Sequence, residues 1–235
     1  MERLDKIISN QTSYSRSDIK QLIKKKKIKV NDNIVLKSDI KIDFNIDIIK
    51  INDKILEIKR FVYLVLNKPK GYVSASKDNN DKTVLELVPE KYKHRKLFPA
   101  GRLDKDTTGL MLITDDGVFA HDILSPKKHV KKTYEVIIDI PISDEMISGF
   151  KSGVMLNDGI CKTTLLEKKD TYKAIVTLTE GRYHQIKRMF GCFKAKVLEL
   201  KRLSIGNYLL PEVLKLGEIK ELTEEELNKI KEIIK

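Results

Sequence analysis

The residues best suited to chemistry gather in one segment, 101–117, which reads GRLDKDTTGLMLITDDG. Two cations, Arg102 and Lys105, flank Asp104 and would keep its carboxylate ionised near neutral pH. An ionised carboxylate on a glycine-containing loop can act as a nucleophile. The alternative is a capped loop in which Asp104, Asp106 and the two following threonines only hydrogen-bond the backbone. The residue types alone leave both interpretations open.

A second polar segment, 180–188, reads EGRYHQIKR and is typical of the start of a charged helix. We expect a helix over 182–190, opened by Gly181. At 3.6 residues per turn, positions 184, 187 and 188 share one face, while 186 and 189 or 190 point to the core. Four side chains here could donate a hydrogen bond to a phosphate, a base or a carboxylate, namely Arg182, His184, Gln185 and Lys187. A charged surface helix would show the same pattern.

The distribution of charge indicates a polyanionic partner. The chain of 235 residues has a formal net charge of +12. Residues 1–29 contain nine Lys or Arg and three acids, a net charge of +6, so half of the excess lies in this short segment. A general lysine bias would spread the charge evenly. We expect nucleic-acid contacts here, from Arg3, Arg16, Lys20, Lys24, Lys25, Lys26 and Lys27.

Several classes of protein have little support in the sequence. No apolar run approaches the roughly 20 residues of a membrane span, and the N-terminus lacks the apolar core of a signal peptide. We therefore expect a cytoplasmic protein without membrane contact. The cysteines, Cys161 and Cys192, have no ligand-like spacing and the four histidines are scattered, so we expect no metal site.

The first 60 residues predict a small helix–helix–strand domain. Apolar residues over 4–8 indicate one helix, and Ser15 with Asp18 can cap a second. A hairpin of strands over 28–30 and 34–36 follows.

The remaining residues, 61–235, predict an α+β domain with a mixed, mostly antiparallel sheet and flanking helices. Helices are expected over 84–88, 143–150 and 223–234, in addition to 182–190. The residues 115–117, which read DDG, are predicted to form a turn. Strands are expected over 61–66, 110–113, 134–138 and 172–178, with a weaker one over 163–166.

The N-terminal segments RLDKII and SRSDIKQLIKKKKIKVND, followed by alternating isoleucines over 46–51, resemble the S4 RNA-binding domain of ribosomal and RNA-modifying proteins. The sequence departs from the usual S4 pattern at Lys27, where a glycine often precedes the strand.

Four later segments resemble, in order and spacing, the pseudouridine synthases, and most of all the ribosomal small-subunit pseudouridine synthase A branch. They are LNKPKGYVSA (66–75), PAGRLDKDTTGLMLITDDG (99–117), KKTYEV (131–136) and GRYHQIKRMF (181–190). This resemblance implies isomerisation of a uridine within RNA to its C-glycoside, after the base is flipped out of its stack. It also implies that no cofactor is needed.

The resemblance further implies roles for individual residues. Asp104 is the nucleophile, attacking either the sugar or the uracil ring, and Lys187 pairs with it. Tyr134 stacks on the uracil and carries a hydroxyl where a proton must leave carbon. Arg102 contacts RNA or fills the gap left by the extruded base. Further RNA contacts are expected from Arg182, His184, Gln185 and Arg188.

The expected substrate is small-subunit (16S) ribosomal RNA, bound by a monomer. The same reaction on 23S ribosomal RNA is an alternative, as is a non-catalytic S4-type factor for ribosome binding or assembly. A hydrolytic carboxylate enzyme is a third possibility, but it usually needs two carboxyl groups that bracket one bond. Asp106 could supply the second carboxyl, although in an extended loop it would point away from Asp104.

Overall fold

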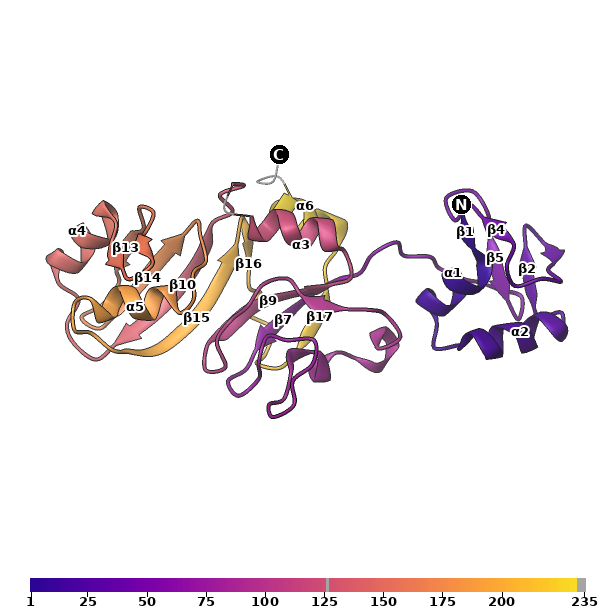
Figure 1. Cartoon of the computed structure of the whole chain (residues 1–235), viewed down its shortest axis with the longest axis horizontal. Coiled ribbons are helices and arrows are strands. Elements are labelled where there is room, and N and C mark those ends of the chain that lie inside the picture. Colours follow the sequence, from indigo (N-terminus) through magenta and orange to yellow (C-terminus); the bar gives the residue numbers. More distant parts are fainter. Residues whose placement is uncertain (126, 232–235) are drawn as a thin grey trace. The chain divides into compact units, whose positions relative to one another are not determined.

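The computed structural model of the protein describes residues 1–125 and 127–231 (Figure 1). The chain divides into two compact units: Met1–Val62 with Val88–Lys96, and Tyr63–Leu87 with Leu97–Lys235. The segment 88–96 therefore belongs to the first unit, whereas the sequence places it in the second domain. Its Arg95 explains the difference, because the guanidinium donates hydrogen bonds to the side chain of Gln11 and to the carbonyl of Lys59.

The first unit contains the predicted helix–helix–strand order. Helices α1 (Leu4–Gln11) and α2 (Arg16–Lys24) lie together at one side of short strands (Figure 1). Buried apolar residues from both helices and from the sheet form its core. The strands are β1 (Glu2–Arg3) paired with β4 (Lys41–Ile42), and a sheet of β3 (Asn33–Ile34), β2 (Ile28–Val30), β5 (Ile49–Ile51) and β6 (Lys54–Ile55). A short 3-10 turn, η2 (Glu90–Tyr92), lies in the segment 88–96.

Helix α2 begins and ends through local backbone chemistry. Ser15 and Asp18 form a reciprocal capping box at its start, as predicted. At its end Lys26 takes a left-handed conformation with φ of 58°. The amide of Lys27 then donates to the carbonyl of Leu22, which satisfies a carbonyl of the last turn. The residue with positive φ is therefore Lys26, one position before the site where the S4 pattern led us to expect a glycine.

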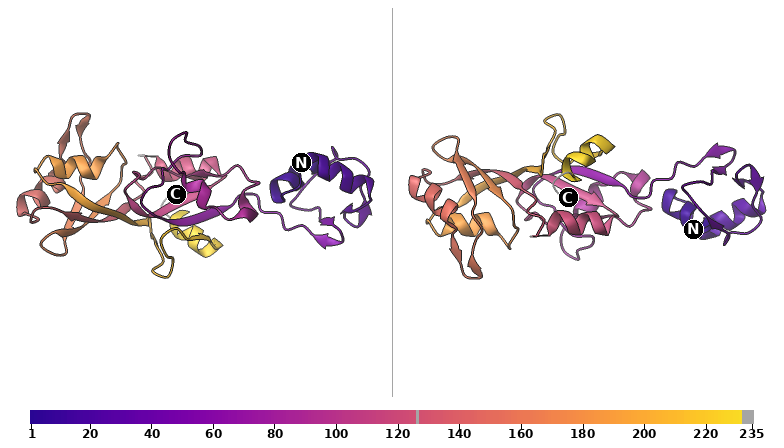
Figure 2. Two further views of the ribbon diagram at one scale, coloured as in Figure 1. Left: turned by 90° about the horizontal axis from the view of Figure 1, so that it is seen from below. Right: turned by 90° about the horizontal axis from the view of Figure 1, so that it is seen from above.

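The second unit is built on a mixed sheet. In the described part of the chain it has nine strands, in the order β13-β14-β10-β15-β9-β7-β17, with β16 paired to β15 and β8 to β9. The pairing of β9 with β15 is parallel and the others are antiparallel, so the predicted mixed, mostly antiparallel sheet is confirmed. Figure 2 shows β10 and β15 running side by side along most of their length. The bounds are β7 (Tyr63–Lys68), β8 (Phe98–Pro99), β9 (Thr108–Thr114), β10 (Lys132–Ile138), β13 (Leu165–Lys168), β14 (Lys173–Leu178), β15 (Val197–Ile205), β16 (Tyr208–Leu209) and β17 (Ile219–Glu221).

The helices of this unit differ from the prediction in two places. The residues 115–117 are not an isolated turn, because Asp116 caps α3 (Gly117–Leu124) by accepting from the amides of Val118 and Phe119. Helix α5 (Gln185–Gly191) begins three residues later than expected. The predicted terminal helix is present as α6 (Glu224–Lys231), and its last expected residues, 232–234, lie outside the described residues. The other two predicted helices correspond to the 3-10 helix η1 (Val84–Leu87) and α4 (Asp144–Ser152), and a small hairpin of β11 (Met155–Leu156) and β12 (Gly159–Ile160) follows α4.

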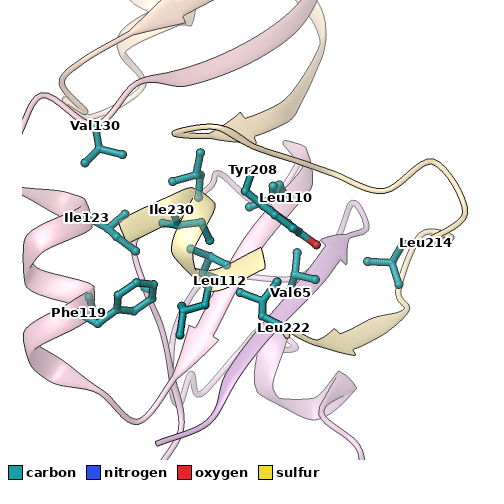
Figure 3. Packing of buried hydrophobic residues seen from close by; sticks show 14 residues of the cluster. Val65, Leu110, Leu112, Phe119, Ile123, Val130, Tyr208, Leu214, Leu222 and Ile230 are labelled. Atoms are coloured by element: carbon teal, nitrogen blue, oxygen red, sulfur yellow. The ribbon is translucent and has the colours of Figure 1, made fainter. Parts of the chain in front are cut away.

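Strand β9 lies at the centre of an apolar core. In Figure 3 Phe119 and Ile123 point from α3 into the cluster, which they form together with Leu110 and Leu112 of β9 and Ile230 of α6. The run of buried residues in β9 explains why the sequence shows continuous rather than alternating hydrophobicity here. A strand held on both faces gives the preceding loop, 101–107, a rigid anchor. No helix in the described ranges is long and apolar enough to cross a membrane.

Candidate active site

A cavity of about 600 Å³ opens in the second unit, and segments far apart in the sequence line it. The loop 101–107, the beginning of β10, the turn 181–184 and the first residues of α5 all contribute to its wall. The two polar segments identified in the sequence therefore meet at one cavity. Seven of the predicted site residues line it: Arg102, Asp104, Tyr134, Arg182, His184, Gln185 and Lys187.

Asp104 lies between two basic side chains. One carboxylate oxygen, Oδ2, is 3.3 Å from Nζ of Lys187, and the other, Oδ1, is 3.3 Å from Nε2 of His184. The side chains of Asp104 and Lys187 are 25% and 26% exposed, so the pair is shielded but open to the cavity. A carboxylate held in this way is oriented and accessible to a ligand.

Lys187 also binds the second carboxylate of the loop. Its ammonium lies 2.7 Å and 2.8 Å from the two carboxylate oxygens of Asp106. The expectation that Asp106 points away from Asp104 is therefore wrong, because residues 104–107 form a turn closed by the bond from the Thr107 amide to the Asp104 carbonyl. The hydrogen bond from Lys187 lowers the pKa of Asp106. Partial burial lowers the pKa of Lys187, but the hydrogen bond to Asp106 and the charges of both carboxylates outweigh it and raise that pKa.

A buried lysine, which the sequence analysis did not single out, holds the loop from beneath. Lys68, the last residue of β7, is fully buried. Its ammonium donates to the carbonyls of Asp104 (3.0 Å) and Thr107 (2.9 Å), and at longer range to those of Pro69 and Lys105. The loop backbone around Asp104 is therefore fixed by a charge-assisted network. The segment that contains Lys68 contributed to the family resemblance, but no local pattern shows that its side chain turns inward.

Two further buried cations lie near the floor of the cavity. Lys132 and Arg202 are 7% and 2% exposed, and both line the cavity. Burial lowers the pKa of Lys68 and of Lys132 to about 8, and the positive charge of Arg202 adds to the effect in both cases. For Lys68 the charges of Asp106 and Asp104 partly oppose the shift. Arg202 comes from β15, a strand that the sequence analysis did not predict because its apolar residues are interrupted by charges.

Tyr134 reaches the cavity from β10. Alternate residues of that strand are buried, and Tyr134 shares its buried side with Lys132 and Val136. Its neighbours across the sheet are Val176 on β14 and Arg202 on β15. The tyrosine is 8% exposed and lines the cavity together with Asp104. An aromatic ring and a carboxylate thus share one concave site.

In the segment 182–188, three further residues predicted to contact RNA form hydrogen bonds within the protein. Arg182 donates to the carbonyls of Gly159 (2.8 Å) and Ile160 (2.5 Å), which ties the turn 181–184 to β12. Gln185 is 4% exposed, and its amide group bonds both the Arg182 amide and the Glu180 carboxylate. The Gln185 side chain therefore stabilises the turn, and its contact with RNA stays a prediction.

The third, Arg188, does not line the cavity. Its guanidinium forms two hydrogen bonds with the carboxylate of Asp158, in the turn between β11 and β12. The same contact lowers the pKa of Asp158. Arg188 and Arg182 together attach the β11–β12 hairpin to the start of α5.

The basic residues predicted for the first unit are all exposed. Arg3 and Arg16 begin or precede the two helices, Lys20 lies on α2, and residues 24–27 form its last turn and the link to β2. Arg3 also pairs with the buried carboxylate of Asp5 at 2.8 Å. The exposed ammonium groups of 24–27 concentrate positive charge at the C-terminal end of α2.

Comparisons with known proteins agree with both parts of the fold. The family model for RNA pseudouridylate synthase matches residues 62–191, and the model for the S4 domain matches residues 2–45. A crystal structure of a pseudouridylate synthase superposes with a TM-score of 0.69 at 37% identity, covering 98% of this chain and 100% of that chain. The chain belongs to the RNA pseudouridylate synthase family and is an isomerase that acts on RNA.

Curated relatives show similarity over nearly the whole length. The chain is 39% identical to the ribosomal small subunit pseudouridine synthase A of Escherichia coli K12, over 96% of this chain and 98% of that protein. It is 37% identical to the enzyme of the same name from Yersinia pestis, over 96% of each. It is also 39% identical, over 98% of each, to a Bacillus subtilis protein described as an uncharacterized RNA pseudouridine synthase.

Proposed function

We propose that this protein isomerises a uridine of small-subunit (16S) ribosomal RNA to pseudouridine, with Asp104 as the nucleophile. The observation that carries the proposal is the position of Asp104, held between Lys187 and His184 in the cavity that Tyr134 also lines. The small-subunit target rests on the relatives named ribosomal small subunit pseudouridine synthase A, which match the chain over almost its full length.

The reaction rearranges bonds without gain or loss of atoms. The bond from the sugar carbon to the ring nitrogen breaks and a bond from the same sugar carbon to a ring carbon forms. The hydrogen of that ring carbon leaves as a proton, and the freed ring nitrogen takes up a proton, so the product is an isomer of the substrate. Asp104 forms a temporary ester-like bond either to the sugar or to the uracil ring, and release of the carboxylate completes the exchange. A shielded, ionised carboxylate suits both routes.

Lys187 and Lys68 prepare Asp104 in different ways. Lys187 supplies a counter-charge that keeps the carboxylate ionised while the uracil displaces water from the cavity. Lys68 acts through the backbone, because its ammonium bonds the Asp104 carbonyl and thereby sets the position of the side chain. Misplacement of a nucleophile by about 1 Å can cost on the order of 10² in rate.

Tyr134 supplies an aromatic surface and a hydroxyl. The ring, 8% exposed in the cavity wall, stacks against the flipped uracil, and the hydroxyl serves near the carbon that loses its proton. Arg102, exposed at the rim of the same cavity, contacts RNA or occupies the gap left in the base stack.

The first unit contributes affinity. Flipping a base out of a stacked RNA helix costs a few kcal/mol, about the range that several phosphate contacts can offset. The exposed cations of 24–27, together with Arg3, Arg16 and Lys20, are suited to grip a structured RNA segment. We expect the protein to act as a monomer, with Asp104, Lys187 and Tyr134 of the same chain at one cavity.

The test is carbodiimide mapping of pseudouridine in ribosomal RNA from cells that lack this protein. We expect one small-subunit pseudouridine to disappear and to return when the wild-type gene is restored, but not when Asp104→Asn is restored. Loss at a large-subunit position instead would reassign the target. Unchanged modification of all ribosomal RNA would reject ribosomal RNA as the substrate, and restoration by Asp104→Asn would favour a non-catalytic role.

A further inference from the structure

An exposed tyrosine lies at the mouth of the cavity, and neither the proposed nucleophile nor the uracil-stacking ring accounts for it. Tyr183 is 70% exposed yet lines the same cavity as Asp104. Its ring is stacked on the imidazole of His184, with ring centroids 3.9 Å apart and an angle of 20° between the planes.

The stacked pair is fixed in place by contacts on its inner side. The imidazole Nε2 of His184 lies 3.3 Å from Oδ1 of Asp104. His184 has a left-handed backbone with φ of 46°, a conformation that is unusual for a residue other than glycine. Strain of this kind is often found where a structure holds a side chain for a purpose.

The backbone before the pair is equally restrained. Arg182 is bonded to the carbonyls of Gly159 and Ile160, and Gln185 joins the Arg182 amide to Glu180. Tyr183 therefore projects from a turn that is tied on both sides. Because the turn is already rigid, binding a flat ligand to Tyr183 costs less conformational entropy.

We propose that Tyr183, supported from behind by His184, is a stacking platform for a base of the substrate RNA next to the flipped uridine. This inference rests on the proposed function and extends it to a second nucleotide. The imidazole covers one face of the tyrosine ring, so the base stacks on the other. The two tyrosines have different roles because their positions differ. Tyr134, 8% exposed inside the cavity, stacks on the flipped uracil, whereas Tyr183, 70% exposed at the mouth, stacks on the neighbouring base.

RNA is the ligand class that best fits this arrangement. Unstacked bases around a flipped nucleotide lose their neighbours, and proteins commonly replace those neighbours with aromatic rings. The cations of the site, among them Arg102 at the rim, favour the phosphates that accompany such a base. A stacking contact of this kind tolerates any base, so the platform strengthens RNA docking without reading sequence.

The first experiment removes the ring and measures turnover on a transcript of small-subunit ribosomal RNA. We expect Tyr183→Ala to raise the RNA concentration for half-maximal rate about tenfold, the loss of one stacked base, with kcat changed less than about threefold. Tyr183→Phe keeps the ring and should stay within about twofold of wild type. Tyr172→Ala is the matched control, since Tyr172 is 47% exposed and does not line the cavity. Equal half-maximal concentrations for Tyr183→Ala and wild type would overturn the proposal.

The second experiment reads stacking directly and does not depend on turnover. The chain contains no tryptophan, so Tyr183→Trp and Tyr172→Trp each introduce a single fluorescent reporter. We expect the same RNA to quench the reporter at position 183 strongly and the one at position 172 little. Equal quenching at both positions would contradict a specific platform. If wild type shows no isomerisation but the reporter at 183 is quenched, the proposed reaction fails while the platform stands.

Discussion

Lys187 and Asp104 form an ion pair in the wall of the cavity, with the ammonium nitrogen 3.3 Å from a carboxylate oxygen. The lysine comes from α5 and the aspartate from the loop before β9. The same ammonium holds Asp106 at 2.7 Å. One lysine thus organises two carboxylates, of which Asp106 is 67% exposed and Asp104 25% exposed. Because their exposure differs, we expect mutation of each acid to have a different effect on turnover.

Asp104→Asn should abolish isomerisation, because a neutral amide is a poor nucleophile, while folding and RNA affinity stay nearly unchanged. Asp106→Asn is the matched control, since it removes the same charge from the same turn and should retain measurable turnover. Tritium release from RNA labelled at uridine C5 measures the reaction, and RNA affinity is measured by filter binding. Turnover by Asp104→Asn would remove its assigned role.

Lys68→Met should lower kcat by about 10²-fold, because the carbonyls of Asp104 and Thr107 lose their donor and the loop shifts. Lys70→Met is the control, since that lysine is exposed in the same segment and should leave kcat unchanged. Single-turnover kinetics on folded protein, checked by circular dichroism, measure the effect. A folded Lys68→Met variant with wild-type kcat would show that the buried ammonium does not position the loop.

Glutamine at all four positions 24–27 should weaken RNA binding and flatten its salt dependence. Removal of one lysine–phosphate ion pair should reduce the slope of log K against log salt by about 0.7 to 0.9. The rate at saturating RNA should stay constant, because these residues belong to the first unit and not to the cavity. Binding titrations at several salt concentrations test this, and an unaltered slope would mean that the cations do not touch RNA.

The free energy of unfolding should depend on pH through the protonation of Lys132. Burial lowers its folded pKa from 10.5 to about 8, so between these values the unfolded chain binds a proton that the folded chain lacks. Raising the pH through this window therefore favours the folded state of wild type. Relative to Lys132→Met, the unfolding free energy of wild type should increase from about pH 8 to about pH 10.5. Urea denaturation measures this. Lys131→Met, which removes an exposed lysine, should show no such trend against wild type.

Gly109→Ala should destabilise the protein by at least about 2 kcal/mol. The residue has φ of 99°, and an added Cβ would lie 2.3 Å from the carbonyl oxygen of Arg202 in the neighbouring strand. Gly117→Ala is the control, because nothing lies within 4 Å of its added Cβ at the start of α3. That change should be neutral or slightly stabilising. Equal denaturation midpoints for the two variants would contradict the close approach of β9 and β15.

Much of the fold was predictable because its signals are local. The capping box of Ser15 and Asp18, the buried run of β9 and the alternation of β10 each depend on neighbours within a few residues. Helix α3 was missed because Asp116, followed directly by a glycine, has the composition of a turn, yet it caps a helix. Strand β15 was missed because Lys201 and Arg202 interrupt its apolar pattern, and the burial of Arg202 is decided by the strands beside it.

The order and spacing of four segments by themselves determined the family of this protein and the residues to examine. Motif order can be read directly from the sequence, without any knowledge of three-dimensional contacts. Only the tertiary structure decided how those residues meet. The turn at 104–107 brings Asp106 to the same lysine as Asp104. The side chain of Lys68 is buried and its ammonium donates to the loop carbonyls. Both contacts join chain segments that are distant in the sequence. A sequence pattern does not show how far apart such segments lie in space.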